Sequence, residues 1–398
     1  MATDKGVWNL QDVRDKQLQD LWGYTAFGDA GGLYSYGYND GGDLGQNNRT
    51  KYSSPVQIPG SWKDAGGVKS DGTLWTWGGN NIGALGLNNL TSYSSPVQVP
   101  GTTWKAAFGT VRPTSETSVA AIKTDGTLWT WGFNFYGQLG QNEAGSPGSP
   151  SNEKSTSLSS PTQVPGTTWG TEGHNKFGWS GGYSSWTAIK TDGTLWAWGA
   201  QGYGNLGQNQ ANVYYSSPVQ IGTDSTWKSI SRGQSSAFMG TKTDGTLWGW
   251  GRNEFGQLGF NSTANYSSPT QIPGTTWDIA TGGFYNGVVT KTDGTLWIMG
   301  YGNYGGLGLA TPAGDTGNTK YSSPVQIGTD STWSRPVPLG TYAAGAIKTD
   351  GTLWVWGQNE GGKLGLNSTA NSNSPVQVTG AWVDSRGFAN ATRSIKEL

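Results

Sequence analysis

The sequence "KTDGTLWTWG", residues 123–132, occurs five more times in this chain with few changes. A leucine in the same place marks each copy, and it also marks one degenerate copy in which tyrosines replace the tryptophans. Repeats of this length are typical of solenoids, propellers and arrays. Seven units, about fifty residues apart, are marked by Leu33, Leu74, Leu128, Leu195, Leu247, Leu296 and Leu353.

Each unit predicts four short strands, which we call A, B, C and D in chain order. In the unit that starts at Trp227, these strands fall at residues 226–231, 236–242, 246–250 and 268–274. The Asp-Gly pair between B and C predicts a two-residue hairpin turn with positive φ. The two tryptophans of strand C share one face and the leucine takes the other, so we expect this strand to be covered on both sides.

The two ends of the chain predict a closed ring. Residues 381–398 match strands A and B and then stop, whereas the sequence from Asp29 onward supplies only C and D. Together they complete one blade, which is how a propeller closes, whereas an open solenoid would need caps. We therefore expect an all-β fold, a seven-bladed β-propeller of four-stranded antiparallel blades over residues 29–398. A short N-terminal helical arm, residues 1–28, would precede it.

The repeats also resemble a known family. "DGTLWTWGFNFYGQLG" (125–140) and "SSPVQVPG" (94–101) are similar to the regulator-of-chromosome-condensation repeat, and the resemblance covers about residues 29–398. It implies a seven-bladed propeller but not one function, because the family includes nucleotide exchange factors for small GTPases and a secreted inhibitor of β-lactamases. An exchange factor would need a dedicated insertion and acidic contact residues, which we do not identify in this sequence.

The composition argues against several classes of function. The net charge is −1 and only 13% of residues are charged, so we expect no nucleic-acid partner. The chain has no cysteine, which excludes disulfides, thiol catalysis and cysteine zinc sites, and His174 is its one histidine. No apolar run is long enough to span a membrane, and residues 1–24 lack the apolar core of a secretory signal. We expect neither membrane insertion nor a signal peptide.

Several motifs that suggest catalysis have simpler interpretations. "GQNEGGKL", residues 357–364, resembles a phosphate-binding loop, but Leu364 stands where Ser or Thr is required and Lys363 fills a glutamine position of the repeat. The repeated aspartates and asparagines are more simply explained by hydrogen bonds within their own turns and loops. We therefore predict a non-enzyme without catalytic residues, metal or cofactor. The repeated residues are Asp71, Asp125, Asp192, Asp244, Asp293, Asp350, Asn39, Asn80, Asn134, Asn253 and Asn359.

Function is expected where the repeat is interrupted. The A–B and C–D connections of a blade lie on one face of the ring, which we call the variable face. The B–C turns and D–A links form the opposite turn face. All four long insertions (110–118, 141–159, 170–184 and 309–320) fall on the variable face, which is typical of binding loops. Loops that have drifted on a tolerant edge are the alternative. The predicted partner-binding residues are Arg112, His174, Lys176, Phe177 and Trp179.

The N-terminal arm is a second interruption. Residues 9–23 place apolar side chains near helical spacing, and a helix this short needs a partner for its apolar stripe. The Gly-Val-Trp opening resembles the N-terminal anchor of tailed-phage virion proteins. Docking onto the propeller's own rim is the alternative. The predicted anchor residues are Val7, Trp8, Leu10, Val13, Leu18, Leu21 and Trp22.

We therefore predict a non-enzymatic binding or structural propeller, and favour a bacteriophage virion appendage, decoration or adhesion protein. Its partners would be other virion proteins through the arm and a host surface protein or glycan on the variable face, with self-association left open. It would be made in the host cytoplasm and reside in the virion. The alternative is a cytoplasmic protein–protein interaction module, either a GTPase regulator or an enzyme inhibitor of the same repeat family.

Overall fold

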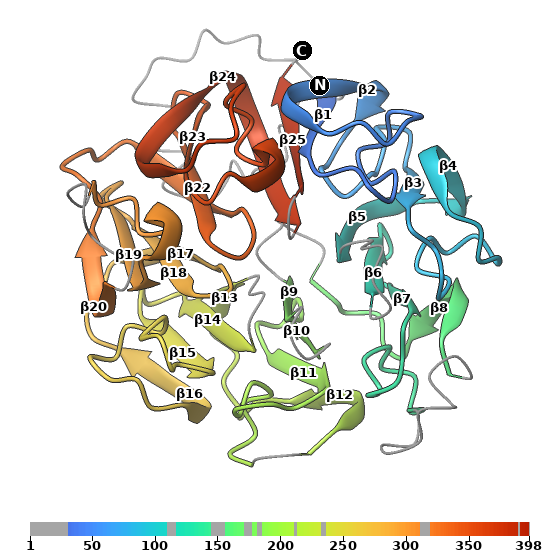
Figure 1. Cartoon of the computed structure of the whole chain (residues 1–398). Helices are drawn as coiled ribbons and strands as arrows, with labels where there is room; N and C mark the ends of the chain where they lie inside the picture. Colours follow the sequence, from blue (N-terminus) through green and yellow to red (C-terminus); the bar gives the residue numbers. More distant parts are fainter. Residues whose placement is uncertain are drawn as a thin grey trace, which may run out of the picture.

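Strands account for almost all the regular structure in this computed structural model, and they are arranged as a ring of blades (Figure 1). Strands A of the blades lie nearest the ring axis and strands D at the rim. The predicted arm over residues 1–28 lies outside the described part of the chain. Within the described part, no helix could span a membrane. The structure describes residues 31–109, 117–144, 156–170, 177–180, 185–210, 213–231, 236–310, 319–388 and 391–397.

Four consecutive blades each form a four-stranded antiparallel sheet in the order A-B-C-D. Blade 3 contains β5(Trp104–Gly109), β6(Ser118–Lys123), β7(Leu128–Gly132) and β8(Leu158–Val164). Blade 4 contains β9(Phe177–Ser180), β10(Ser185–Ile189), β11(Leu195–Gly199) and β12(Tyr215–Gln220). Blade 5 contains β13(Trp227–Ile230), β14(Ala237–Lys242), β15(Leu247–Gly251) and β16(Tyr266–Ile272). Blade 6 contains β17(Trp277–Gly282), β18(Asn286–Lys291), β19(Leu296–Tyr301) and β20(Lys320–Gln326), with the short 3₁₀ helix η2(Asn303–Gly305).

Blades 7 and 1 share one long strand, and blade 1 is the predicted composite blade. Strand β24 runs from strand D of blade 7 into strand A of blade 1, where β25 pairs with it and with β1. Gly31 pairs with Glu397, so the two ends of the described chain lie side by side. Blade 7 contains β21(Trp333–Pro338), β22(Ala343–Lys348), β23(Thr352–Gly357), η3(Glu360–Gly362) and the first part of β24(Ser372–Phe388). Blade 1 adds β25(Ala391–Glu397), β1(Gly31–Gly37) and β2(Tyr52–Trp62).

One hydrogen bond recurs at every junction between blades and shows that the ring is closed. A backbone N–H of each C–D loop donates to a carbonyl in strand D of the next blade. The bond from Asn367 N to Ser53 O, at 2.8 Å, joins blade 7 to blade 1. These contacts and the pairing of β1 with β25 confirm the seven-bladed propeller and its composite blade. The other six bonds run from Asn47 to Ser94, Asn88 to Ser159, Asn142 to Ser216, Asn209 to Ser267, Asn261 to Ser322 and Ala310 to Asn373.

The repeated motif, Lys-Thr-Asp-Gly-Thr-Leu-Trp-x-Trp-Gly in most copies, forms a compact cation–aromatic unit in each copy. In blade 5, the Lys242 ammonium lies 4.9 Å from the Trp227 ring centroid and 3.7 Å from that of Trp248. The Trp248 indole N–H donates to Thr246 Oγ1 at 2.8 Å, and the Thr246 hydroxyl donates to Asp244 Oδ1 at 2.7 Å. Lysine, threonine, aspartate and the first tryptophan of the repeated motif therefore act together to fix the hairpin.

The second tryptophan of the repeated motif joins neighbouring blades. Trp250 Nε1 donates at 2.9 Å to the Asn205 carbonyl of blade 4. Gly207 lies against the same ring with a φ of +67°, and a Cβ at this position would stand 3.3 Å from Trp250 Nε1. The hydrophobic core accordingly sits between blades, where Trp250 packs with residues of blade 4 such as Leu206. The same bond to the preceding blade is made by Trp77, Trp131, Trp198 and Trp356.

The B–C turns differ from the prediction. In blade 5, Lys242 N donates to Thr246 O at 3.0 Å, so the turn holds three residues, and in it only Gly245 has a positive φ, +78°. The prediction of a two-residue primed turn, which requires a positive φ at aspartate as well, is wrong. Asp244 instead accepts the backbone N–H of Thr246 at 3.0 Å, which favours an ordinary right-handed conformation.

Blade 2 has two full strands, whereas four strands per unit were predicted. Its strands C and D are β3(Thr73–Gly78) and β4(Tyr93–Thr102), but A and B are reduced to two isolated bridges, Trp62 to Lys69 and Val68 to Leu74. Leu74 follows Trp62 by 12 residues, whereas Leu247 follows Trp227 by 20 in blade 5. The short A–B connection leaves room near the axis for side chains from other blades.

Candidate functional site

The residues predicted to bind a partner are only partly within the described chain. Arg112, His174 and Lys176 lie outside the described residues. Phe177 and Trp179 were expected in an A–B loop, but they belong to strand β9. In this strand Phe177 pairs with Ala188 of β10, and Trp179 pairs with Trp186 of β10. The loop assignment of residues 177–180 is therefore wrong. Bulky residues alternate over residues 177–180, which is typical of a strand. They form strand A of blade 4 beside β10, and the bridge of Trp169 with Lys190 belongs to the same blade. Their partner-binding role stays a prediction, as do the anchor residues, which also lie outside the described chain.

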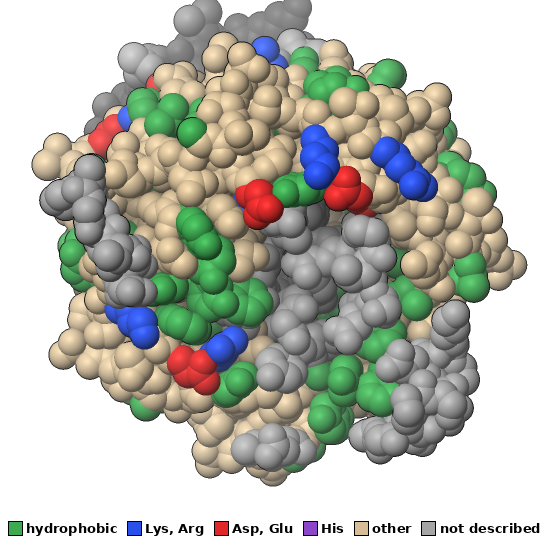
Figure 2. All heavy atoms as spheres, viewed as in Figure 1, with side chains coloured by type: hydrophobic (Ala, Val, Ile, Leu, Met, Phe, Trp, Pro, Cys, Tyr) green, Lys and Arg blue, Asp and Glu red, His purple; other side chains and the backbone are tan. Residues whose placement is uncertain are grey.

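A large group of aromatic side chains on the variable face is absent from the prediction. We call it the aromatic patch, and it is formed by C–D loops and A–B turns of blades 4 to 7. Figure 2 shows hydrophobic side chains gathered over β13, β14, β17 and β18, with basic and acidic side chains at their edge. Tyr203 and Tyr304 are exposed and the other rings of the patch are half-buried. Apolar patches that reach the surface mark interaction sites. The patch consists of Tyr203, Phe255, Phe284, Tyr285, Tyr301, Tyr304 and Tyr342.

The rings of the patch contact one another in series. The centroids of Phe255 and Tyr285 are 4.6 Å apart with the rings nearly perpendicular, and Tyr285 stacks on Tyr342 at 4.6 Å. Tyr304 meets Tyr342 edge-on at 5.1 Å. Such offset and edge-to-face pairs hold aromatic side chains in fixed orientations. The patch is therefore a preformed surface.

Two cations lie over these rings. The Arg252 guanidinium is 5.1 Å from the Tyr203 centroid, and its Nε and Nη2 donate to Glu254 Oε2 at 3.0 and 2.7 Å. The Lys320 ammonium is 5.2 Å from the centroid of Phe255. Arginine and tyrosine together are the residue types that most often dominate binding energy at protein interfaces.

Two tyrosines of the patch have unusual backbone geometry. Tyr203 and Tyr304 have φ values of +61° and +55°, in the left-handed region that bulky residues rarely adopt. They are also among the most exposed large hydrophobic side chains of the described residues, at 37% and 45%. Their loops lack the Asn that orders the other C–D loops, because Gln201 and Gly302 take its place. Strain in an exposed aromatic residue is more typical of a functional site than of scaffold.

The tyrosine hydroxyls of the patch lie close together. Burial, followed by a hydrogen bond with the Tyr285 hydroxyl, raises the pKa of Tyr342 well above its ordinary value. The hydroxyls of Tyr301 and Tyr304 are near enough to add to this effect. The Tyr342 phenol therefore remains protonated at physiological pH.

A second, charged sector lies where blades 7 and 1 meet. The Tyr38 hydroxyl donates to Glu360 Oε1 at 2.8 Å, and the Lys51 ammonium lies 4.0 Å from the Tyr38 ring centroid. Lys51 also pairs with Asp40 at 3.6 Å. Figure 2 shows acidic and basic side chains beside one another in the sector of β24, β25 and β1. The variable face thus has an aromatic sector and a charged sector.

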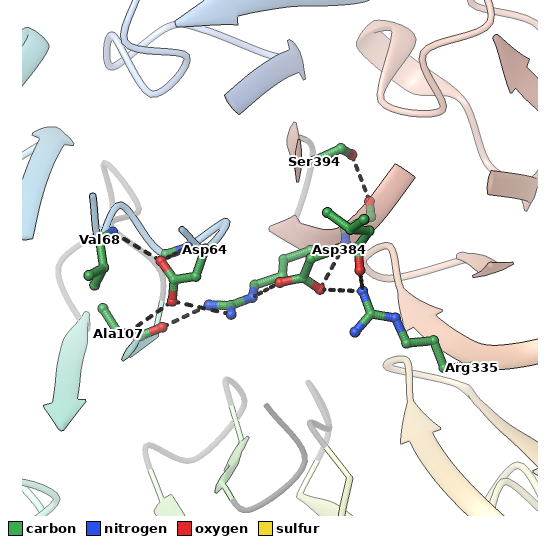
Figure 3. A network of polar contacts seen from close by, with 10 residues as sticks. Asp64, Val68, Ala107, Arg335, Asp384 and Ser394 are labelled. Atoms are coloured by element: carbon green, nitrogen blue, oxygen red, sulfur yellow. Dashed lines mark hydrogen bonds and ion pairs between the residues drawn. The ribbon is translucent and has the colours of Figure 1, made fainter. Parts of the chain in front are cut away.

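A buried polar network fills the space beside the short blade 2 (Figure 3). Arg386 of β24 donates to the Ala107 carbonyl of blade 3 at 2.8 Å, and it pairs with Asp64 of blade 2 at 3.4 Å. It also pairs with Asp384 at 3.1 Å, which in turn pairs with Arg335 of blade 7 at 3.1 Å. The exposed fractions of Asp64, Asp384 and Arg386 are 1%, 5% and 4%. The network links blades 7, 1, 2 and 3, so we interpret it as structural.

The repeated aspartates and asparagines and Lys363 all make contacts within their own turns, loops and core. Hydrogen bonds from Thr246 lower the pKa of Asp244, as equivalent threonines do in the other five turns. Asn253 Oδ1 accepts from Leu258 N at 2.9 Å within its own loop. Lys363 is fully buried, so it is not placed to bind a phosphate. Among the described residues no three His, Cys, Asp or Glu side chains are grouped to hold a metal ion.

A closed ring of seven antiparallel blades with a preformed aromatic patch on one face defines a β-propeller whose variable face is suited to recognition. The family model for the regulator of chromosome condensation (RCC1) repeat matches more than half of the chain, and the chain belongs to this family. The matches cover residues 71–108, 125–169, 192–239, 244–289 and 350–384.

Two curated relatives come from Arabidopsis thaliana. The ultraviolet-B receptor UVR8 is 26% identical over 153 residues, which cover 38% of this chain and 31% of the receptor. The mitochondrial RCC1 domain-containing protein RUG3 is 29% identical over 198 residues, or 48% of this chain and 44% of the relative. The matches therefore span less than half of either relative.

Solved structures share the whole propeller. Human WBSCR16 has a TM-score of 0.71 at 18% identity and covers 92% of this chain and 99% of its own. Prp20p from Saccharomyces cerevisiae has a TM-score of 0.71 at 17% identity and covers 93% of this chain and 92% of its own. At these identities the similarity shows the fold alone.

Proposed function

We propose that this chain is a non-enzymatic protein-interaction propeller, whose partner binds the aromatic patch on the variable face. The observation that carries the proposal is the pair Tyr203 and Tyr304, which are strained and exposed. Tyr304 contacts the Tyr342 ring, and the Arg252 guanidinium lies over both Tyr203 and Phe255. A scaffold of rigid strands with loops rich in Tyr, Gly, Asn and Ser is also the composition of antibody binding sites. Such loops present large, amphipathic contact area at little entropic cost.

The family comparison supports the same class of function. The structure of yeast Prp20p was presented with its binding to Gsp1p and histones, and another structure contains yeast RCC1 (Prp20) bound to Kap60. These partners are proteins in each case. By analogy, a protein partner is the first expectation for this chain, whether it acts as a GTPase regulator, an enzyme inhibitor or an adaptor.

The non-catalytic part of the proposal rests on how the ionisable groups are used. The turn aspartates accept hydrogen bonds from their own threonines, and the buried charges near the axis pair with one another. Lys363 is covered and donates to Gln358 at 3.1 Å. Each of these groups already has a structural role.

The bacteriophage virion assignment stays a prediction. It rests on residues 1–28 and on the composition of the chain, and the described blades add nothing to it. The comparisons support the alternative, a cellular interaction module, better. Removing residues 1–24 tests the virion assignment, which predicts a folded propeller that no longer attaches to its parent assembly.

Site-specific photo-crosslinking in the cells that produce the protein tests the proposed function. A photoreactive amino acid is placed at Tyr203 or Tyr304, and at Thr243 on the turn face as the matched control. We expect the same partner protein to be captured from both tyrosine positions and not from position 243. Equal capture from both faces, or capture from position 243 alone, would contradict the proposal.

A further inference from the structure

The form of the aromatic patch suggests what kind of segment binds there. Its central contacts run from Phe255 to Tyr285, then to Tyr342 and to Tyr304, each ring touching the next. The interplanar angles along this track are 81°, 20° and 67°, so ring faces and ring edges alternate. Phe284 and Tyr301 contact Tyr285 at the side of this track. The track itself offers successive ring contacts along one line, which an extended chain can use.

The hydrogen-bonding groups along the track are phenol hydroxyls, which can donate as well as accept, and those of Tyr342 and Tyr285 bond to each other. Tyr285, Tyr301, Tyr304 and Tyr342 bring four phenol hydroxyls together, and the raised pKa of Tyr342 keeps its proton in place. A polyproline II segment has backbone carbonyls without internal partners, and its prolines have no N–H to donate. Aromatic grooves that recognise proline-rich segments use this match of flat rings and donors.

The charge beside the track is positive. Lys320 is exposed, and its ammonium lies 5.2 Å from the Phe255 centroid and 5.7 Å from that of Tyr301. None of the described carboxylates lies within ion-pair distance of it. Arg252 differs, because Glu254 already holds two of its nitrogens. Lys320 is therefore the cation best placed to receive a carboxylate from outside.

We infer that the aromatic patch binds an extended, proline-rich segment of a partner protein, with a carboxylate of that segment over Lys320. The inference rests on the proposed function, since it specifies the partner of the same surface. The prolines would lie on the ring faces and the backbone carbonyls would accept from the tyrosine hydroxyls. The carboxylate fixes the direction in which the segment lies, because it is attracted to the Phe255 end of the track.

Fluorescence anisotropy with the full chain and labelled ten-residue peptides tests this inference. The probe peptide has prolines at every second or third position and aspartate at one end. One control peptide replaces proline with glycine and serine, and another replaces the aspartate with lysine. We expect the probe to bind with a Kd on the order of 10–100 µM and the proline-free control to bind at least tenfold more weakly.

Four variants, one of them a matched control, sharpen the test. Tyr342→Ala should weaken the probe at least tenfold, whereas Tyr342→Phe keeps the ring and should weaken it less. Lys320→Glu should reverse the preference, so that the lysine-ended peptide binds better than the probe. Tyr214→Ala, an exposed tyrosine of the same face outside the patch, is the matched control and should leave affinity unchanged.

The outcomes separate this inference from the proposed function. No binding of the probe, or binding that Tyr342→Ala and Lys320→Glu leave unchanged, overturns the proline-rich assignment. If a partner is nevertheless cross-linked from residues 203 and 304, the face recognises a folded surface and only the inference fails. Binding of a glycan to the patch in place of any protein would overturn both.

Discussion

In blade 5 the paired residues Phe238 and Trp250 pack against blade 4, whereas the equivalent pair in blade 1 is Thr392 and Tyr36. The apolar pair is completely buried and belongs to a hydrophobic cluster. The hydroxyl pair is buried too, but Tyr36 shares a hydrogen bond with Ser394 at 3.0 Å. Burial raises the Tyr36 pKa to about 12, although this bond opposes the shift.

The difference continues toward the ring axis. Beside the short blade 2, Arg386, Asp64 and Asp384 form buried ion pairs. Hydrophobic contacts are non-directional, so one repeated core can join any two standard blades. Buried ion pairs require fixed partners and geometry, and they contribute specificity more readily than stability. We interpret the polar network as the feature that fixes how the two ends of the chain and the short blade meet.

The largest expected effect comes from removing the arginine at the centre of the network. Arg386→Ala leaves Asp64 and Asp384 buried without their shared cation, so the free energy of unfolding should fall by about 3–5 kcal/mol. Chemical denaturation measures this change. Arg252→Ala, which breaks an exposed pair with Glu254, is the matched control and should cost less than about 1 kcal/mol. Equal effects of the two substitutions would show that the network does not hold the ring.

Much of this contrast could be predicted from the sequence, but its chemistry could not. Repeat spacing predicted the seven blades and the composite blade because each strand is defined by local patterns. The sequence also shows that the stretch from Trp62 to Leu74 is about eight residues shorter than the equivalent stretch of blade 5. Its consequence was not, because Arg386 reaches Asp64 across 322 positions of sequence. Such contacts depend on which blades become neighbours.

The aromatic patch was missed for a similar reason. Attention to long insertions favoured Arg112 and His174, whereas the patch is built from loops of ordinary length. Two signals could have identified it: the loss of the loop asparagine around Tyr203 and Tyr304, and the aromatic residues in short A–B turns such as Tyr342. The turn type was also mispredicted, because an Asp-Gly pair fits both a primed turn and the observed turn with a single left-handed glycine.

The second largest expected effect on stability concerns a buried lysine where blades 7 and 1 meet. Burial lowers the pKa of Lys363 from 10.5 to about 8, and the repeat has glutamine at this position in blades 3 and 5. Since the unfolded chain binds the proton more tightly, Lys363 destabilises the fold below about pH 8, and this cost disappears as the pH rises toward 10.5. Lys363→Gln should raise stability at pH 7 by about 1–3 kcal/mol and remove this pH dependence. Thermal unfolding across pH 7 to 10 measures both, and a lower melting temperature at pH 7 would contradict the account.

A smaller effect is expected on the turn face, in the tryptophan-rich part of the ring. A hydrogen bond from Lys348, helped by Thr332, lowers the pKa of Asp330 to about 2. The folded-state pKa is depressed, so the contribution is present above the ordinary value of 3.8 and is lost as the pH falls toward 2. Asp330→Asn should cost less than about 1 kcal/mol at pH 7, and most of this cost should be lost at pH 2. A cost at pH 2 equal to that at pH 7 would assign the effect to packing.

The most direct test of the central claim is the free energy of unfolding of the double variant Tyr203→Asn, Tyr304→Asn. Asparagine tolerates the left-handed backbone, so the variant relieves strain of about the same size as the ring contacts that it loses. If the tyrosines are retained for recognition, the stability should change by no more than about 1 kcal/mol, whereas Phe238→Ala in the core should cost about 3–5 kcal/mol. A loss above about 2 kcal/mol in the double variant would show that the two tyrosines support the fold and would contradict the recognition role proposed for the aromatic patch.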